Sequence, residues 1–232
     1  MRPLEHTSRH YERELQVLKE KILFLGGTVE EMIASSMRSI LQREPERARQ
    51  VIASDPKVDA AELDIDHLCL NLLALRQPAA SDLRFIATAL KIVTDLERIG
   101  DLAVNIAERS LELNEEPPLK PYIDIPRMAT AVQTMLHQSL DAFVNRDPAQ
   151  ARAVLGADAA VDDLNVQLFR ELLTYMIEDP RSVSRALRIT FTAKYLERIG
   201  DHATNIAQMV IFMCEGRDVR HPDVQDRADH QI

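Results

Sequence analysis

The chain has 232 residues, of which 46% are hydrophobic and 4% aromatic, and its formal net charge is −9. This length and apolar content suffice for one large domain or two of ordinary size, and the scarcity of aromatic residues favours helix over sheet. Because phosphate contacts require clustered Lys and Arg, the negative charge argues against nucleic acid as the main partner and leaves cations or basic protein surfaces.

The sequence carries no recognisable signal for secretion or for membrane insertion. Its first ten residues are too polar for the apolar segment of a secretion signal, and no stretch approaches the roughly 18 apolar residues of a membrane span. Cys69 and Cys214 lie outside any CxxC pair and in apolar surroundings, which is typical of reduced core thiols. We therefore expect a cytoplasmic protein that reaches the inner membrane only through its partners.

The first half of the chain is predicted to form three helices. From Leu15 onward, apolar residues follow the three-four spacing of an amphipathic helix, and Gly26 and Gly27 inside this pattern predict a bend or a close helix contact. Pro45 breaks or kinks the pattern, because proline is excluded from helix interiors. The next two helices are expected at about Asp55–Arg76 and, with Ser81 as a cap, up to about Asn114.

The second half repeats this plan. A proline-rich linker at 117–125 separates the halves, and residues 43–55 align with 146–158 at an offset of 103. Three more helices are expected at about 126–146, 158–176 and 181–214. The predicted fold is all-α, with two tandem, pseudo-symmetric three-helix bundles formed by residues 1–116 and 126–232.

A thirteen-residue segment occurs once in each half. Residues 95–107 read DLERIGDLAVNIA and residues 195–207 read YLERIGDHATNIA, so that ten of the thirteen positions agree. Core packing alone tolerates many apolar residues. A repeat that keeps its Glu, Arg, Gly, Asp and Asn therefore points to chemistry on a surface.

Helix geometry places the repeated acids opposite the core. With 100° per residue, Glu97 and Asp101 lie within about 40° of each other, and the apolar positions of the motif lie on the far side. Four acids of the preceding helix fall within an arc of about 60° by the same arithmetic. In the second half only two of these four have acidic counterparts, since Asn165 and Phe169 occupy the other places. The acids of the preceding helices are Asp55, Asp59, Glu62 and Asp66 in the first half and Asp158 and Asp162 in the second.

The acids of neighbouring helices are predicted to converge on cations. Gly100 and Gly200 occur inside strong helical patterns where Ala would be preferred by roughly 1 kcal/mol, which indicates a helix backbone passing close by. Converging carboxylates repel, and oxygen-only ligands suit Mg, Mn, Ca or ferric iron. The candidate metal ligands are Glu97, Asp101, Asp55, Asp59 and Glu62 in the first half, and Glu197, Asp201, Asp158 and Asp162 in the second.

Other interpretations of the acids remain open at this point. They can be an ordinary solvated face, in which Arg98 and Arg198 each pair with the carboxylate at i+3 and leave less charge for a metal. A metal-dependent phosphohydrolase is an alternative from another class, and a structural oligomerisation module is a third. The sequence contains no phosphate-binding glycine loop, GxSxG elbow or HExxH motif, so we expect no enzyme.

The paired motifs, together with the segments at 73–84 and 210–221, resemble the PhoU family of phosphate-transport accessory regulators over nearly the whole chain. The resemblance implies two symmetric three-helix bundles, cytoplasmic location, frequent dimerisation and multinuclear metal sites at the E(D)xxxD motifs. It also implies a restraint on the phosphate-starvation response, through coupling of the phosphate ABC transporter's ATPase subunit to a membrane sensor kinase. These implications are expectations for the chain.

Overall fold

The computed structural model describes residues 3–217 and 219, with side chains described from His10 onward. Within this part of the chain there are six α-helices and no strand, as the helical periodicity predicts. A short 3-10 helix, η1, precedes the last α-helix. The elements are α1 (Pro3–Leu41), α2 (Pro45–Arg76), α3 (Ala80–Asn114), α4 (Asp124–Asn145), α5 (Pro148–Glu178), η1 (Pro180–Ser182) and α6 (Val183–Glu215).

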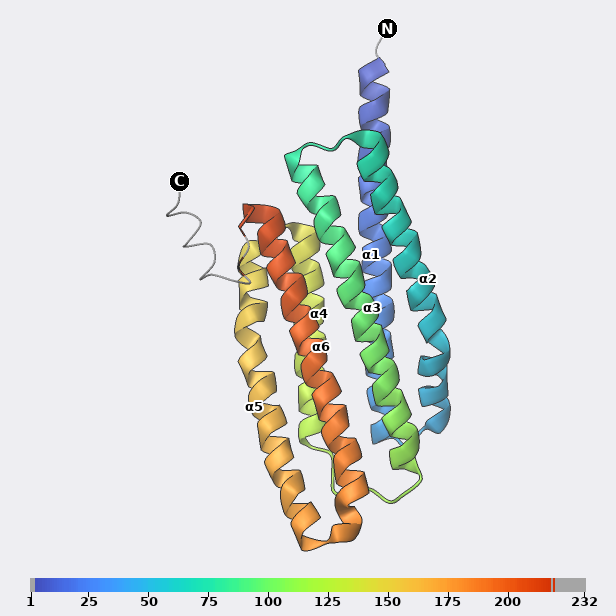
Figure 1. Cartoon of the computed structure of the whole chain (residues 1–232), viewed down its shortest axis with the longest axis vertical. Helices are drawn as coiled ribbons and strands as arrows, with labels where there is room; N and C mark the ends of the chain where they lie inside the picture. Colours follow the sequence, from blue (N-terminus) through green and yellow to red (C-terminus); the bar gives the residue numbers. More distant parts are fainter. Residues whose placement is uncertain (1–2, 218, 220–232) are drawn as a thin grey trace.

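The helices form two three-helix bundles that lie side by side (Figure 1). Helices α1, α2 and α3 make the first bundle, and α4, α5 and α6 make the second. In Figure 1, α2, α3, α6 and α5 form a front layer, with α1 and α4 behind them. The bundles meet where α3 packs antiparallel to α6 and where α1 packs on α4. The two helices that carry the repeated motif are therefore neighbours at the centre of the molecule.

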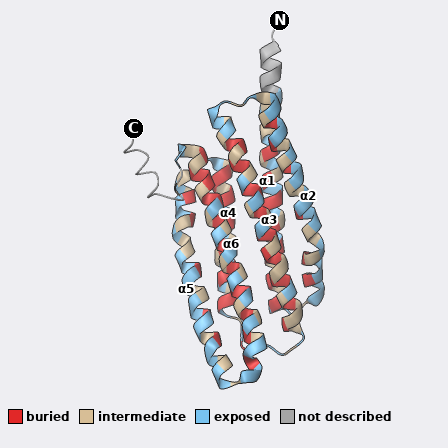
Figure 2. Ribbon diagram, viewed as in Figure 1, coloured by how far each residue is buried: buried red, intermediate tan, exposed pale blue. Residues whose placement is uncertain are grey.

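The core is built from the apolar faces that the sequence pattern predicts (Figure 2). In the first motif Leu96, Ile99, Ala103 and Ile106 have no solvent-exposed surface, and the same holds for their counterparts in the second motif. Full burial of a Leu or Ile side chain stabilises the fold by roughly 1.5–3 kcal/mol. This packing fixes the rotation of α3 and α6, and it turns the acidic side of each helix away from the core.

Helices α2 and α5 begin earlier than predicted. Their expected starts at Asp55 and Asp158 are wrong, because the helices begin at Pro45 and Pro148. Proline is well suited to the first position of a helix, where its missing N–H has no partner to lose. Asp147 completes the start of α5, since its Oδ1 accepts hydrogen bonds from the backbone N–H groups of residues 149 and 150. Both helices thus extend past the acidic stretch at each end.

The predictions at Ser81 and Gly26 have different outcomes. The predicted cap at Ser81 is wrong, because α3 begins at Ala80 after Ala79 and the Ser81 side chain does not cap it. The predicted close contact at Gly26 is confirmed, since a Cβ on this residue would lie 2.5 Å from Leu140 Cδ1 of α4. This glycine lets α1 and α4 approach where the two bundles meet.

The connection between the bundles is tied down by side chains. Arg43 Nη2 donates to the backbone carbonyls of Asn114 and Glu116, at 2.7 and 2.8 Å. Lys120 is buried and pairs with Glu171 of α5. The division into units at 1–116, 117–125 and 126–232 stays a prediction, and the end of the last unit lies outside the described residues. Among the described helices, none has the length and apolar content needed to cross a bilayer.

Candidate functional site

The acids of α2 and α3 face one another across a tight helix contact. The contact is made at Gly100 of α3, where an added Cβ would lie 3.2 Å from Val58 Cγ1 of α2. Because only hydrogen occupies this position, the two helices approach closely along the acidic stretch. The close helix contact predicted at Gly100 is therefore confirmed, and the neighbouring helix is the acidic one of the same bundle. We call Asp55, Asp59, Glu62 and Asp66 of α2, with Glu97 and Asp101 of α3, the first acidic site.

Most carboxylates of the first acidic site are half-buried rather than fully solvated. The Glu97 side chain is 17% exposed, and Asp55, Glu62 and Asp66 are of intermediate exposure. Asp55 Oδ1 and Asp66 Oδ1 are buried and have no hydrogen-bond partner. A buried carboxylate oxygen without a donor costs free energy. These two oxygens therefore offer lone pairs to a ligand that arrives from solution.

The pKa values of the first acidic site also indicate that its negative charges are unfavourable. Burial raises the pKa of Glu97 above its ordinary range, and the charges of Asp101, Glu62 and Asp59 raise it further, against a smaller lowering by Arg98. Burial also raises the pKa values of Asp55 and Glu62, and neighbouring carboxylates add to both shifts. Carboxylates that repel one another in a partly desolvated place favour a proton or a cation.

Arg98 compensates part of this charge, as the solvated-face interpretation predicts. Its Nη1 lies 3.4 Å from Asp101 Oδ2, and its Nε lies 3.4 Å from Glu97 Oε2. The Arg98 side chain is 58% exposed, and ion pairs of this kind contribute little to stability. Arg98 thus pairs with two of the six carboxylates of the site. The first acidic site therefore keeps a net negative charge.

The second bundle repeats the arrangement with fewer acids. A Cβ on Gly200 of α6 would lie 3.4 Å from Asp158 Oδ1 of α5, so the acidic faces of these helices meet as well. Burial, followed by the neighbouring carboxylates, raises the pKa of Asp158, and burial followed by Glu197 raises that of Asp201. We call Asp158 and Asp162 of α5, with Glu197 and Asp201 of α6, the second acidic site.

The second acidic site differs from the first because a lysine pairs with one of its carboxylates. Lys194 Nζ lies 2.6 Å from Glu197 Oε1 and 2.5 Å from Oε2, with hydrogen-bond geometry only to Oε1. The first bundle has Thr94 at the equivalent place, which carries no charge. Glu197 is 14% exposed and thus resembles Glu97 in burial. Lys194 therefore offsets part of the charge of Glu197, which Thr94 cannot do for Glu97.

The donor set of both sites suits hard cations. All side chains concerned present carboxylate oxygens, which are the ligands of Mg²⁺, Mn²⁺ and ferric iron. Within residues described here, no three His, Cys, Asp or Glu side chains already converge on a single coordination point. The orphaned Oδ1 atoms of Asp55 and Asp66 suit a cation as ligands, but they lie eleven residues apart on α2, a rise of about 16 Å, so each fits a separate ion. The assignment of the nine ligands stays a prediction.

The polar contacts between the bundles were not predicted, and one of them joins the two copies of the motif. His202 Nδ1 of α6 lies 2.8 Å from Asp95 Oδ1 of α3, and Asn205 Nδ2 donates to the same oxygen at 3.4 Å. Both Asp95 and His202 stand at positions where the two motif copies differ, since their counterparts are Tyr195 and Leu102. These differences between the two motif copies were the only sign in the motif that the two residues have a special contact. They mark one of the polar contacts that join α3 to α6, which also include that of Arg188 with Glu112.

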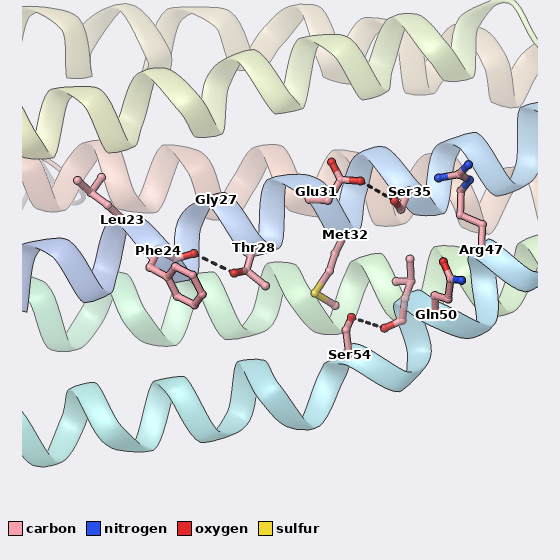
Figure 3. Close-up of a pocket in the computed structure, with 11 residues that line it drawn as sticks. Leu23, Phe24, Gly27, Thr28, Glu31, Met32, Ser35, Arg47, Gln50 and Ser54 are labelled. Carbon is pink, nitrogen blue, oxygen red and sulfur yellow. Dashed lines mark hydrogen bonds between the residues drawn. The ribbon is translucent and has the colours of Figure 1, made fainter.

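An apolar groove lies between α1 and α2 (Figure 3). Its volume is about 650 Å³, and Leu23, Phe24 and Met32 contribute to its apolar lining. Glu31 is the one carboxylate in this lining, and it accepts a hydrogen bond from Ser35 Oγ at 2.8 Å. This groove therefore lacks the clustered charge of the acidic sites.

Comparison with known proteins identifies the family. The sequence model of the PhoU domain matches twice, at residues 22–110 and 125–210, once in each bundle. This chain belongs to the PhoU family. The resemblance inferred from the motifs is thereby confirmed. The two matches coincide with the two three-helix bundles, so PhoU domain and bundle are the same unit in this chain.

Curated PhoU relatives match over nearly their full length. Proteins named phosphate-specific transport system accessory protein PhoU homolog, from Aquifex aeolicus and Pseudomonas aeruginosa, are each 42% identical over 217 residues. The match covers 94% of this chain and 98% of the Aquifex protein, and 93% of this chain and 90% of the Pseudomonas protein. These names describe an accessory protein and not an enzyme.

Solved PhoU structures have the same architecture. The crystal structure of PhoU from P. aeruginosa superposes with a TM-score of 0.86 at 40% identity, covering 89% of this chain and 100% of that one. The phosphate transport system regulatory protein PhoU from Streptococcus pneumoniae superposes with a TM-score of 0.84 at 26% identity, covering 90% and 99%. The predicted pair of three-helix bundles is thus shown.

Proposed function

We propose that this protein is a regulatory accessory protein of phosphate transport, which lowers phosphate uptake and phosphate-starvation signalling when phosphate is sufficient. The observation that carries the proposal is the double PhoU match over both bundles, with relatives that are named as accessory proteins of the phosphate-specific transport system. The two acidic sites support the proposal, because cations that bind there could change how an adaptor contacts its partners.

The proposed mode of action is coupling between two membrane-associated partners. The adaptor contacts the ATPase subunit of the phosphate ABC transporter and the membrane sensor histidine kinase, and it works in the cytoplasm as a homodimer. Two similar bundles in one chain suit this role, because they present two related surfaces. The net charge of −9 favours basic patches on the partners.

We propose further that Mg, Mn or Fe ions bind at both acidic sites. Glu97 and Asp101 of α3, with Asp55, Asp59 and Glu62 of α2, would hold the ions in the first bundle. Glu197, Asp201, Asp158 and Asp162 would hold them in the second. A bound cation supplies positive charge between facing carboxylates and thereby ties the outer helix to the central one. The acids of α2 and α3 then form a fixed docking surface.

Co-purification tests the proposed function. The tagged protein, expressed in its own phosphate-replete cells, is expected to retain the transporter ATPase subunit and the sensor kinase, identified by mass spectrometry. A Glu97→Ala/Asp101→Ala variant is expected to retain less of both, with an unchanged helical circular-dichroism spectrum. A Glu108→Ala variant, on the same helix outside the acidic site, serves as the matched control. Absence of both partners from the wild-type sample would contradict the proposal.

A further inference from the structure

An apolar groove lies between α5 and α6 on the outer side of the second bundle. Its floor contains Val166, Phe169 and Leu173 of α5 and Phe191 of α6, which are between 38% and 49% exposed. The groove has a volume of about 540 Å³. We call these four residues, with Arg170 and Lys194 at the edges, the α5–α6 groove. Exposed apolar side chains gathered in one groove mark interaction sites more often than scattered ones do.

The first bundle shows that the fold does not require this apolar surface. At the positions equivalent to Phe169 and Phe191 the first bundle has Asp66 and Lys91, while the surrounding helices pack in the same way. The duplicated unit therefore serves as an internal comparison. Two charged positions of one bundle are occupied by exposed phenyl rings in the other. Because core packing does not explain the rings, they indicate a ligand.

The edges of the groove carry positive charge on an acidic protein. Arg170 has no carboxylate within ion-pair distance among the described residues, and it lines the groove beside Phe169. Lys194 lines the opposite edge from α6, where Glu197 already shares its charge. The net charge of the chain is −9. Two cations beside an apolar floor thus complement a ligand with an apolar strip and flanking carboxylates.

The dimensions of the groove suit a helix. On α5 the lining extends from Asn165 to Leu173, a helical rise of about 12 Å, or roughly two turns. An amphipathic helix presents apolar residues at i, i+3, i+4 and i+7 over such a length. We infer that the α5–α6 groove binds an amphipathic helix of a protein partner, with its apolar strip on Phe169 and Phe191 and its carboxylates toward Arg170 and Lys194. The inference rests on the proposed function, which supplies the transporter ATPase subunit and the sensor kinase as partners.

Binding measurements with purified partners test the inference. The full-length protein is titrated with the transporter ATPase subunit and, separately, with the cytoplasmic part of the sensor kinase. A Phe169→Ala/Phe191→Ala variant is expected to bind one of them at least tenfold more weakly, since truncated aromatic residues at the centre of an interface dominate its affinity. Arg170→Glu is expected to weaken the same complex and to reduce its sensitivity to salt.

Controls separate the groove from other surfaces. Phe24→Ala removes a phenyl ring that is 75% exposed on α1, and it is expected to leave both affinities unchanged. Circular dichroism and metal content are measured for every variant, and Arg170→Glu supplies an independent test should the double variant not fold. If wild type binds one partner and both groove variants bind it equally well, the inference is wrong and the proposed function is retained.

Two further outcomes would also overturn the inference. If wild type binds neither partner, both the inference and the proposed function are contradicted. If sedimentation shows that the groove variants convert a dimer to a monomer without any loss of partner affinity, the occupant is a second copy of this chain.

Discussion

Replacing Glu97 by Gln should change the stability of the protein in opposite directions without and with metal. Glu97 is opposed by Asp101 at i+4 and by Glu62 and Asp59 across the helix contact. Like-charge pairs on a helix cost roughly 0.2–0.5 kcal/mol each. Allowing for partial relief by Arg98, Glu97→Gln should raise the free energy of unfolding of the metal-free protein by about 0.5–1 kcal/mol.

With metal present, the same substitution should lower stability relative to wild type. A cation that binds only the folded state stabilises it by about 2.7 kcal/mol at one hundred times its dissociation constant. Gln has no charge to offer, so Glu97→Gln loses much of this gain. The assay is urea unfolding followed by circular dichroism, in chelator and in excess Mn²⁺, with Glu108→Gln as the control. A destabilised variant in chelator, or equal stabilisation of both proteins by Mn²⁺, would refute the reasoning.

Two other predictions concern the pH dependence of the first acidic site and the glycines of α1 and α3. The first concerns pH. Because the pKa of Glu97 is raised in the folded protein, its contribution to the free energy of unfolding is fully present below the ordinary carboxyl pKa of 4.5. This contribution is lost as the pH rises through the raised pKa. In chelator, the stability advantage of Glu97→Gln over wild type should therefore vanish at acidic pH and grow toward neutrality, and a constant difference in unfolding titrations from pH 4 to 7 would contradict this. The second concerns the glycines: Gly27→Ala should stabilise the fold by about 1 kcal/mol, because nothing lies within 4 Å of the added Cβ. Gly100→Ala should gain less, because its Cβ would lie 3.2 Å from Val58 Cγ1, and equal gains in urea unfolding would argue against the close contact of α2 and α3.

The helices and their buried faces could be predicted because both depend on local periodicity. Leu96, Ile99 and their repeats recur at helical spacing, and the structure buries all of them. The starts of α2 and α5 were missed for a physical reason. Proline is destabilising inside a helix but favourable at its first position, and Pro45 alone does not distinguish these cases.

For the first acidic site, the sequence predicted that the acidic sides of two neighbouring helices face each other. Gly100 is an unfavourable residue in a helix unless a neighbour needs the space, and that neighbour is Val58 of α2. The contact of Asp95 with His202 could not be predicted, because periodicity gives the face of a helix but not the helix that covers it from another bundle. The same limit applies to Phe169. The sequence shows that this residue replaces an acid, but its exposure beside Phe191 depends on tertiary packing.

Metal content is the most direct test of the central claim that the facing carboxylates of α2 and α3 hold cations. The protein is purified without chelators, and its metal content is measured by elemental analysis for wild type and for Glu97→Ala/Asp101→Ala. The account predicts bound Mg, Mn or Fe in wild type and a lower ratio of metal to protein in the variant, with an intact first bundle. The same ratio in both proteins would contradict it.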